Sequence, residues 1–259
     1  MMTTLSSDPV RILHITDPHL FANAESSLRG TVTYETLTAV LDHYRYSAWE
    51  ADLILMTGDV VQDDTADAYE RFKELLSPLG LPVVCVPGNH DVRPMMESAL
   101  SVAPFSYCDT MDAGDWLLIG IDSCIDDDAG GFIRDSEMQR LADILHQTSA
   151  SHVAVCLHHP PLPMQSKWLD EVGLRNGAEF LDLIAASGNV RLTLFGHVHQ
   201  TFSAMYEGTQ IIGTPSTCRQ FMPGSDEFAL DDKPPAYRRI ELSADGTVST
   251  ELVWVTENT

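Results

Sequence analysis

The chain has 259 residues, 44% of them hydrophobic, which is enough for one domain with a sizeable core or for a tight pair of domains. Its 38 acidic and 15 basic side chains give a formal charge of -23, which repels nucleic acid and anionic lipid and disfavours a nuclease or a membrane-surface role. The five cysteines are scattered without a C-x-x-C pair, so we expect a cytoplasmic protein without disulfides. No apolar run approaches about 18 residues, so we expect neither a signal peptide nor a membrane span.

The first part of the chain alternates apolar strands with amphipathic helices. Apolar runs predict strands at residues 10–15, 53–56 and 81–86, and apolar residues at helical spacing predict helices at 33–49 and about 66–79. Strands that are apolar throughout are typical of a sheet whose faces are covered by helices.

The alternation continues less regularly in the second part. Strands are predicted at residues 116–121, 153–157 and 191–195, and helices at 136–147 and 178–186. After His199 the pattern changes to alternating strands at 201–206, 210–212, 237–242 and 247–255, with an Asp245-Gly246 hairpin turn before the last. We predict a single domain over residues 1–259, in which the C-terminal strands (about 200–255) complete the second of two sheets. The stretch from Cys218 to Pro235 is predicted to be a loop over a site or a partner surface.

Five clusters of metal-binding residue types follow the apolar strands. They read D-x-H at residues 17–19, G-D at 58–59, G-N-H-D at 88–91, H-x-P at 158–160 and G-H-x-H at 196–199. Ligands of open α/β sheets collect at the carboxyl ends of the strands, so we expect the clusters to converge. Residues two apart in extended backbone point the same way, so Asp17 and His19 are expected to bind one ion together, as are His197 and His199.

The side chains in these clusters suit metal ions. Asp59 can bridge two ions through its two oxygens, Asn89 offers a carbonyl oxygen, and His158 offers an imidazole. Mixed nitrogen and oxygen ligands fit Mn, Fe, Zn or Co rather than calcium or a thiolate site. Each cluster alone has a structural interpretation, such as a tight turn at Gly-Asp or Gly-Asn-His-Asp. Seven ligand-type residues at five strand ends are poorly explained by packing, so we predict a pair of metal ions that assists phosphate-ester hydrolysis.

The ordered motifs resemble those of the calcineurin-like metallophosphoesterases over nearly the whole chain. Further stretches are similar to bacterial class III cyclic-nucleotide phosphodiesterases, which act on 3',5'-cyclic AMP: ITDPHLF at 15–21, WLD at 168–170 with LRN at 174–176, and TPSTC at 214–218 with QF at 220–221. The resemblance implies an α/β fold, a four-layer αββα sandwich of two mixed sheets flanked by helices. It also implies hydrolysis of 3',5'-cyclic AMP to 5'-AMP by a metal-bridged hydroxide at a dinuclear centre.

The resemblance further implies which residues hold each ion. One ion would be held by Asp17, His19, Asp59 and His199, and the other by Asp59, Asn89, His158 and His197, with Asp59 bridging the two. The ions would be divalent or of mixed valence, and their identity among Fe, Mn, Zn and Co is open. His159 competes with His158 in the fourth cluster, but the H-x-P spacing of the family favours His158 and leaves His159 as a neighbour.

The residues expected to act in catalysis are His90, Asp59 and Asn89. Because Asn89 beside it would bind metal, His90 is expected to donate a proton or a hydrogen bond to a phosphate oxygen. Asp91 would either orient that imidazole or cap the following helix. The substrate is expected to contact His19, Asp59, Asn89, His90 and His199.

Other functions remain open. The same centre would cleave glycerophosphodiesters, 2',3'-cyclic nucleotides or small phosphomonoesters, and sequence says little about the loops that decide among them. A non-catalytic metal-binding scaffold is a remote alternative, since such proteins usually lack ligands or the catalytic histidine. We expect a small-molecule substrate, no nucleic-acid or membrane partner, and a chain that is compatible with a homodimer. Arg93, Arg134 and Arg219 could contact a phosphate, but surface arginines are common and none is placed in the site.

Overall fold

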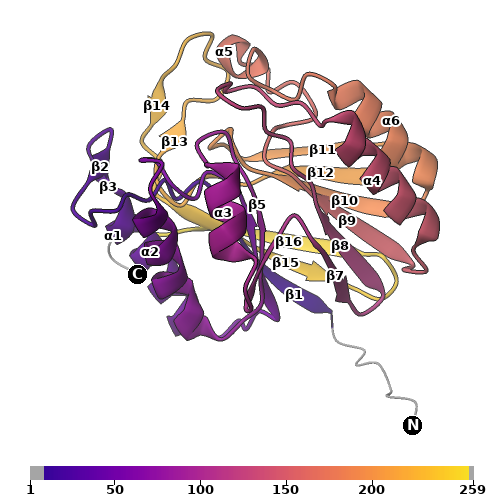
Figure 1. The fold of residues 1–259 in the computed structure, drawn as a ribbon, viewed down its shortest axis with the longest axis horizontal. Helices are drawn as coiled ribbons and strands as arrows, with labels where there is room; N and C mark the ends of the chain where they lie inside the picture. The colour runs from indigo at the N-terminus through magenta and orange to yellow at the C-terminus, as the bar shows by residue number, and fades with distance from the viewer. Residues whose placement is uncertain (1–8, 257–259) are drawn as a thin grey trace.

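Two six-stranded β-sheets pack face to face in the computed structural model, which describes residues 9–256 (Figure 1). The first sheet has the order β16 (Val248–Trp254), β15 (Ala236–Leu242), β1 (Val10–Ile15), β4 (Leu53–Thr57), β5 (Val83–Val86) and β6 (Phe105–Tyr107). The second has the order β11 (Phe202–Tyr206), β12 (Thr209–Gly213), β10 (Val190–Phe195), β9 (His152–Cys156), β8 (Trp116–Gly120) and β7 (Thr110–Ala113). Each sheet combines parallel and antiparallel pairs, which confirms the prediction of two mixed sheets.

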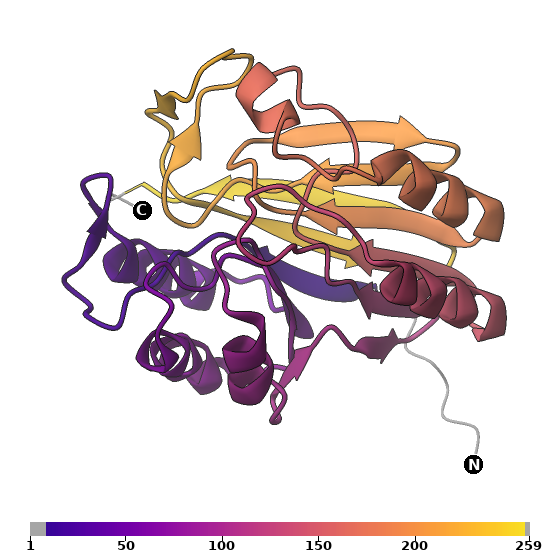
Figure 2. The same cartoon turned by 45° about the horizontal axis from the view of Figure 1, so that its top comes forward.

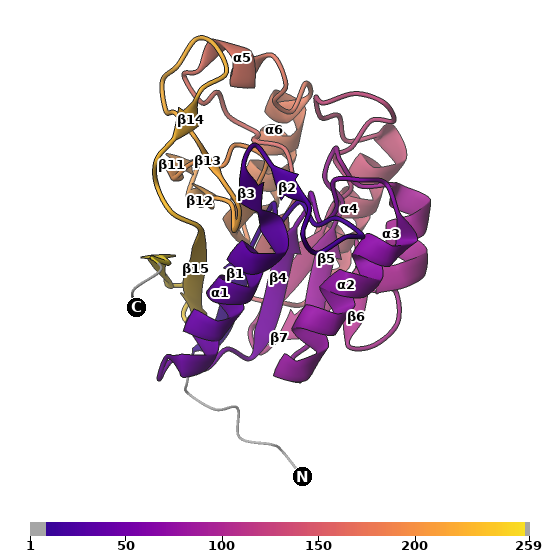
Figure 3. The same cartoon turned by 90° about the vertical axis from the view of Figure 1, so that its left-hand side faces the viewer.

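Helices cover the outer face of each sheet. The first sheet carries α1 (Thr33–Tyr46), α2 (Ala66–Leu76) and α3 (Arg93–Leu100), and Figure 3 shows α1 in front of β1 and β4 and α2 beside β5 and β6. The second sheet carries α4 (Asp135–Gln147) and α6 (Gly177–Ser187). Sequence patterns predicted α1, α2, α4 and α6, whereas a helix was expected after Asp91 without predicted bounds and is α3.

Three separate apolar cores hold the layers together. The first lies between the helices and the first sheet and includes Leu41 of α1. The second lies between the sheets, where Leu55 of β4 and Leu194 of β10 are fully buried. The third includes Phe180 of α6 and lies outside the second sheet. Helix, sheet, sheet and helix therefore form the four layers of an αββα sandwich.

Short elements surround the carboxyl ends of the parallel strands. They are the hairpin of β2 (Ser27–Leu28) and β3 (Thr31–Val32), the one-turn helix α5 (Lys167–Asp170) and the hairpin of β13 (Gln220–Phe221) and β14 (Leu230–Asp231). The 3-10 turn η1 (Ser77–Leu79) extends α2. The stretch 218–235, predicted as a loop, thus contains a hairpin, and Figure 2 shows both hairpins at the same end of the molecule. Within residues 9–256 no helix has the length and apolar character needed to cross a membrane.

The prediction that all C-terminal strands complete the second sheet is wrong for the last two. β11 and β12 do extend the second sheet, but β15 pairs antiparallel with β1 of the first, and β16 pairs with β15. β15 has apolar residues on both faces: Tyr237 is buried under the helices and Ile240 is buried between the sheets. A strand with two apolar faces must be covered on both. At the edge beside β1, the helices cover one face of β15 and the second sheet covers the other.

Arg238 of β15 joins the two sheets through buried hydrogen bonds. Its guanidinium donates to Thr214 Oγ1 (3.0 Å) and to the carbonyl of Gly213 (3.1 Å), at the end of β12 in the second sheet. Thr214 Oγ1 also lies 2.9 Å from His14 Nδ1 of β1. Burial lowers the pKa of Arg238 to about 10, so the side chain stays charged at neutral pH.

We expect Arg238→Ala to lower the free energy of unfolding by about 2–4 kcal/mol, because it leaves buried acceptors without a donor. Urea denaturation followed by circular dichroism would measure the loss. Arg191→Ala, at an exposed position of β10, is the matched control and should change the stability little. Equal stabilities for the two variants would contradict a structural role for Arg238.

Candidate metal centre

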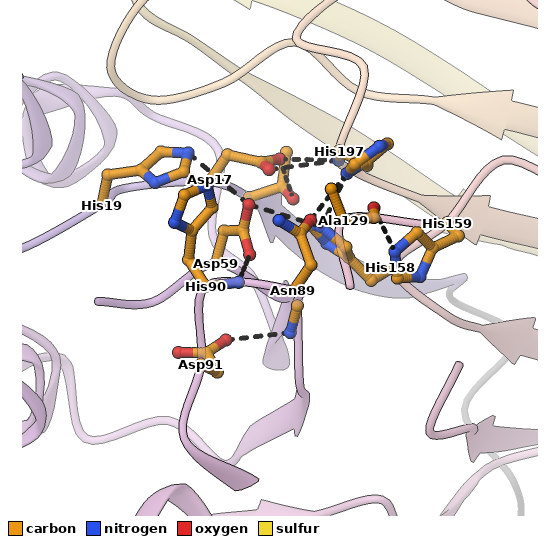
Figure 4. A network of polar contacts seen from close by, with 12 residues as sticks. Asp17, His19, Asp59, Asn89, His90, Asp91, Ala129, His158, His159 and His197 are labelled. Atoms are coloured by element: carbon orange, nitrogen blue, oxygen red, sulfur yellow. Dashed lines mark hydrogen bonds and ion pairs between the residues drawn. The ribbon is translucent and has the colours of Figure 1, made fainter. Parts of the chain in front are cut away.

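The five predicted clusters lie together at the carboxyl ends of β1, β4, β5, β9 and β10 (Figure 4). Three of these strands belong to the first sheet and two to the second, so the site lies where the two sheets meet. All seven residues expected to bind metal contribute a donor atom here: Asp17, His19, Asp59, Asn89, His158, His197 and His199. The predicted convergence is therefore present in the fold.

The donor atoms form two groups. In the first, His199 Nε2 lies 3.2 Å from His19 Nε2 and 3.3 Å from Asp17 Oδ1. In the second, His197 Nδ1 lies 2.9 Å from Asn89 Oδ1 and 3.2 Å from His158 Nε2. All of these residues are buried except Asn89, which is partly buried.

Asp59 lies between the two groups. Its Oδ2 atom is 3.7 Å from His19 Nε2 of the first group and 3.4 Å from His158 Nε2 of the second. Its other oxygen accepts a hydrogen bond from the backbone N–H of His90 (2.8 Å), which fixes the carboxylate in place. The Asp17 carboxylate is also grouped with each of these histidines, but among the described residues only the Asp59 carboxylate lies within ion-pair distance of both.

The chemistry of the donor set fits metal cations. The Nδ1 atoms of His158 and His199 face the carbonyl oxygens of Thr57 (2.7 Å) and Arg219 (2.6 Å), so the Nε2 lone pairs point into the site. Lone pairs of buried nitrogen and oxygen atoms that face each other repel unless a cation lies between them. Burial opposes a charged imidazole, but the Asp59 carboxylate raises the pKa of His158 to about 9, so positive charge is favoured at this position.

Most of the donor residues do not have extended backbone, contrary to the prediction. Five of them have positive φ angles: Asp17 (52°), His19 (47°), Asp59 (54°), His197 (66°) and His199 (48°). Asp17 and His19 still reach the same donor group, but His197 and His199 face different groups, so the expectation that this pair shares an ion on account of its spacing is wrong. The left-handed conformation is costly for residues with a side chain, and such strain is concentrated at functional sites.

Glycines before two of the donors allow the close approach of the loops. A Cβ atom on Gly58, whose φ is 92°, would lie 2.5 Å from His158 Nδ1. A Cβ atom on Gly88 would collide with the backbone and carboxylate of Asp59. Only glycine lets the loops after β4 and β5 approach each other this closely.

His158 and His159 differ in what their ring nitrogens can do. Both ring nitrogens of His159 face structural partners, Ser123 Oγ (2.9 Å) and the carbonyl oxygen of Ala129 (3.3 Å). His158 has one such partner, Thr57, and its Nε2 faces the other donors. This arrangement favours His158 over His159 as the ligand of the fourth cluster.

His90 lies beside the donor groups, and neither suggested role of Asp91 is correct. The Asp91 carboxylate accepts from the backbone N–H groups of Val60 (3.1 Å) and Gly88 (2.9 Å), and α3 begins after Val92 without a side-chain cap. The neighbour of the His90 ring is instead Gln62, whose Nε2 lies 3.2 Å from His90 Nδ1. When the Gln62 amide donates this bond, the His90 proton resides on Nε2. No feature of the sequence singled out Gln62.

Comparison with known proteins agrees with this geometry. The family model of the calcineurin-like phosphoesterases matches residues 10–201. The chain belongs to this family. It is 39% identical over 244 residues to the 3',5'-cyclic adenosine monophosphate phosphodiesterase CpdA of Escherichia coli K12, covering 94% of this chain and 89% of that protein. It is 35% identical over 250 residues to the CpdA of Pseudomonas aeruginosa, covering 96% and 92%.

Solved structures confirm the fold of this phosphoesterase. A dimetal phosphatase from Danio rerio matches with a TM-score of 0.65 and 17% identity, covering 96% of this chain and 100% of the other. The four-layer architecture inferred from the sequence motifs is thus the architecture of the family.

Two cavities of this calcineurin-like phosphoesterase meet at His90. The larger, about 520 Å³, is lined by Asp64, Asp126 and Asp127. The smaller, about 240 Å³, is lined by Arg29, by Arg219 and by five of the seven donor residues: His19, Asp59, Asn89, His197 and His199. A phosphate diester is an anion, so the acidic cavity repels it and the smaller one favours it.

The arginines near the site therefore divide into two kinds. Arg93 and Arg134 both bond to Asp122 (3.0 and 2.9 Å), so their charge is already compensated. Arg219 lines the smaller cavity beside His199, contrary to the expectation that no arginine belongs to the site. Arg29 reaches the same cavity from the turn between β2 and β3. Only the fold brings these two residues, far apart in sequence, to one place.

Proposed function

We propose that this protein hydrolyses the cyclic phosphodiester of 3',5'-cyclic AMP and releases 5'-AMP. The observation that carries the proposal is the position of Asp59 between two donor groups, which is the arrangement expected of a carboxylate shared by two cations. The names of the relatives support the substrate, because both CpdA proteins are 3',5'-cyclic adenosine monophosphate phosphodiesterases.

We assign one divalent ion to Asp17, His19 and His199 and a second to Asn89, His158 and His197, with Asp59 shared. Mn, Fe, Zn and Co all suit such a mixture of imidazole and oxygen donors. When bound, two such ions lower the pKa of water and offset the charge of the phosphoryl oxygens. Arg29 and Arg219 add positive charge at the cavity that leads to the donors, within a chain of formal charge -23.

His90 is assigned the proton transfer. Hydrolysis forms a bond from a water oxygen to phosphorus and breaks the bond from phosphorus to the 3' oxygen. The water loses one proton in this step, and the 3' oxygen must gain one as it leaves. His90 Nε2 carries a proton when Gln62 donates to Nδ1, so it can supply a hydrogen bond or the proton to that oxygen. The backbone bond from His90 to Asp59 (2.8 Å) keeps the imidazole beside the donor groups.

Hydrolysis assays with defined metals test this proposal. The purified protein would be loaded separately with Mn, Fe, Zn or Co and offered 3',5'-cyclic AMP, 2',3'-cyclic AMP, a glycerophosphodiester and a chromogenic diester. We expect turnover of 3',5'-cyclic AMP to 5'-AMP. Fast turnover of another ester without hydrolysis of cyclic AMP would refute the substrate but keep the phosphoesterase activity. Bound metal without any hydrolysis would instead favour a scaffold.

We also propose that the chain is one domain that works in the cytoplasm on a small molecule. The return of β15 and β16 to the first sheet, after the second sheet is formed, supports one domain because no cut in the chain separates the two sheets. All five cysteines are free thiols, which suits a reducing compartment.

A further inference from the structure

The smaller cavity has two chemically different walls. One wall consists of metal-centre residues, among them His19 and His199. The other part of the lining is aromatic and comes from two segments, with Trp168 on α5 and Phe221 and Phe228 on the β13–β14 hairpin. Phosphate hydrolysis requires the metal-centre residues, but it does not explain why aromatic residues line the same cavity.

The three aromatic rings form one cluster. Trp168 lies 5.2 Å from both Phe221 and Phe228, and the two phenylalanine rings lie 5.3 Å apart, all measured between ring centroids. The three interplanar angles are 69°, 73° and 71°, so the rings meet edge to face. Phe228 remains 40% exposed and Trp168 is only partly buried, so the cluster has apolar surface that the protein itself does not cover.

The aromatic cluster is fixed to the metal centre. The ring of Phe221 stacks on His199 with centroids 4.1 Å apart and planes 7° from parallel. The backbone N–H of Phe221 donates to the carbonyl of His199 (3.2 Å), and His199 Nδ1 donates to the carbonyl of Arg219 (2.6 Å). One face of Phe221 is thus used to hold a donor histidine, so the ring surface left for a ligand comes from Trp168 and from the face of Phe228 that Arg29 does not cover.

Arg29, from the β2–β3 hairpin, also lines the cavity and contacts the aromatic cluster. Its guanidinium carbon lies 4.1 Å from the centroid of the Phe228 ring, close enough for a cation–π contact. Residues from the N-terminal and C-terminal parts of the chain therefore meet over the cavity. The larger cavity, which His90 also lines, offers no comparable surface, since its other lining residues include Asp64, Asp126 and Asp127 but no phenylalanine, tyrosine or tryptophan.

We propose that Trp168 and Phe228 bind the base of the nucleotide, and that the stretch 218–235 serves to present this surface. The proposal rests on the proposed function, because it takes as its ligand a cyclic nucleotide whose phosphate lies at the metal centre. In such a molecule the base is one ribose away from the phosphate, and the aromatic cluster is separated from His199 only by Phe221. A planar base stacks on aromatic rings through its faces, and this contact does not require a particular set of hydrogen-bond donors and acceptors.

Steady-state kinetics of the metal-loaded enzyme would test the role of the two rings. We expect Trp168→Ala and Phe228→Ala each to raise KM for 3',5'-cyclic AMP about 10-fold or more, the size expected when a base loses an aromatic ring on which it stacks. Hydrolysis of the base-free analogue, ribose 3',5'-cyclic phosphate, should change little in either variant. Trp168→Phe should recover part of the loss. Tyr46→Ala, at a ring that is 89% exposed at the end of α1, is the matched control.

Equilibrium binding gives a second measurement that does not depend on turnover. Calorimetry of the metal-loaded wild-type protein should show tighter binding of 5'-AMP than of ribose 5-phosphate, and the difference should shrink in Phe228→Ala. Equal affinities for the two ligands, or an equal rise of KM for cyclic AMP and its base-free analogue, would overturn the proposal. A wild-type enzyme that binds 5'-AMP more tightly but does not hydrolyse cyclic AMP would refute the proposed function and retain the base-binding surface.

Discussion

Asp59→Asn is expected to lower kcat/KM for 3',5'-cyclic AMP about 10³-fold, equivalent to about 4 kcal/mol of transition-state stabilisation. The carboxylate lies within 3.7 Å of donors in both groups, so its negative charge would hold both ions. The asparagine side chain keeps an oxygen that can accept the backbone N–H of His90, which should preserve the fold. Metal content measured by mass spectrometry should fall together with activity.

Asp67→Asn is the matched control for this experiment. Asp67 is exposed in the first turn of α2, so the same loss of one negative charge should leave metal content and activity unchanged. Full metal content and near-normal activity in Asp59→Asn would show that this carboxylate is not shared between two ions. Thermal unfolding of both variants would separate a lost ligand from a lost fold.

Most of the fold was predictable because its core strands are short and apolar throughout. Runs such as residues 53–56 and 191–195 can be buried only in a sheet with both faces covered, and the helices between them fix a layered α/β architecture. The place of β15 was not predictable in this way. Alternation of side chains shows that Tyr237 and Ile240 face opposite sides of a strand, but not which sheet has a free edge to receive it.

The donor residues of the site were predictable from residue type and position, and the surrounding residues were not. Asp59 and His158 are recognisable because a carboxylate and an imidazole directly follow apolar strands. Gln62 and Phe228 are ordinary loop residues whose role depends on which segments meet in space. The pairing of His197 with His199 failed for a different reason: spacing predicts side-chain direction only in regular backbone, and φ is positive at both residues.

His90→Asn is expected to lower kcat for cyclic AMP about 10²- to 10³-fold while metal content and KM stay nearly unchanged. His90 lies between the two cavities, and its ring centroid is 5.0 Å from that of His19. In this role His90 Nδ1 accepts a hydrogen bond from the Gln62 amide, and Nε2 gives its proton to the leaving oxygen. Loss of metal from the variant would show instead that His90 is a ligand, since its ring also lies near Asp59 and His19.

The leaving group distinguishes proton transfer from simple charge stabilisation by His90. The 3' oxygen of a ribose is a poor leaving group and needs a proton, whereas p-nitrophenolate leaves without one. If His90 acts as the acid, the loss in kcat should therefore be much smaller for bis(p-nitrophenyl) phosphate than for cyclic AMP. An equal loss with both substrates would mean that His90 stabilises phosphoryl charge rather than protonating the leaving oxygen. Gln62→Ala, which removes only the orienting amide, should cost about 10-fold and show the same dependence on the leaving group if that amide sets which nitrogen carries the proton.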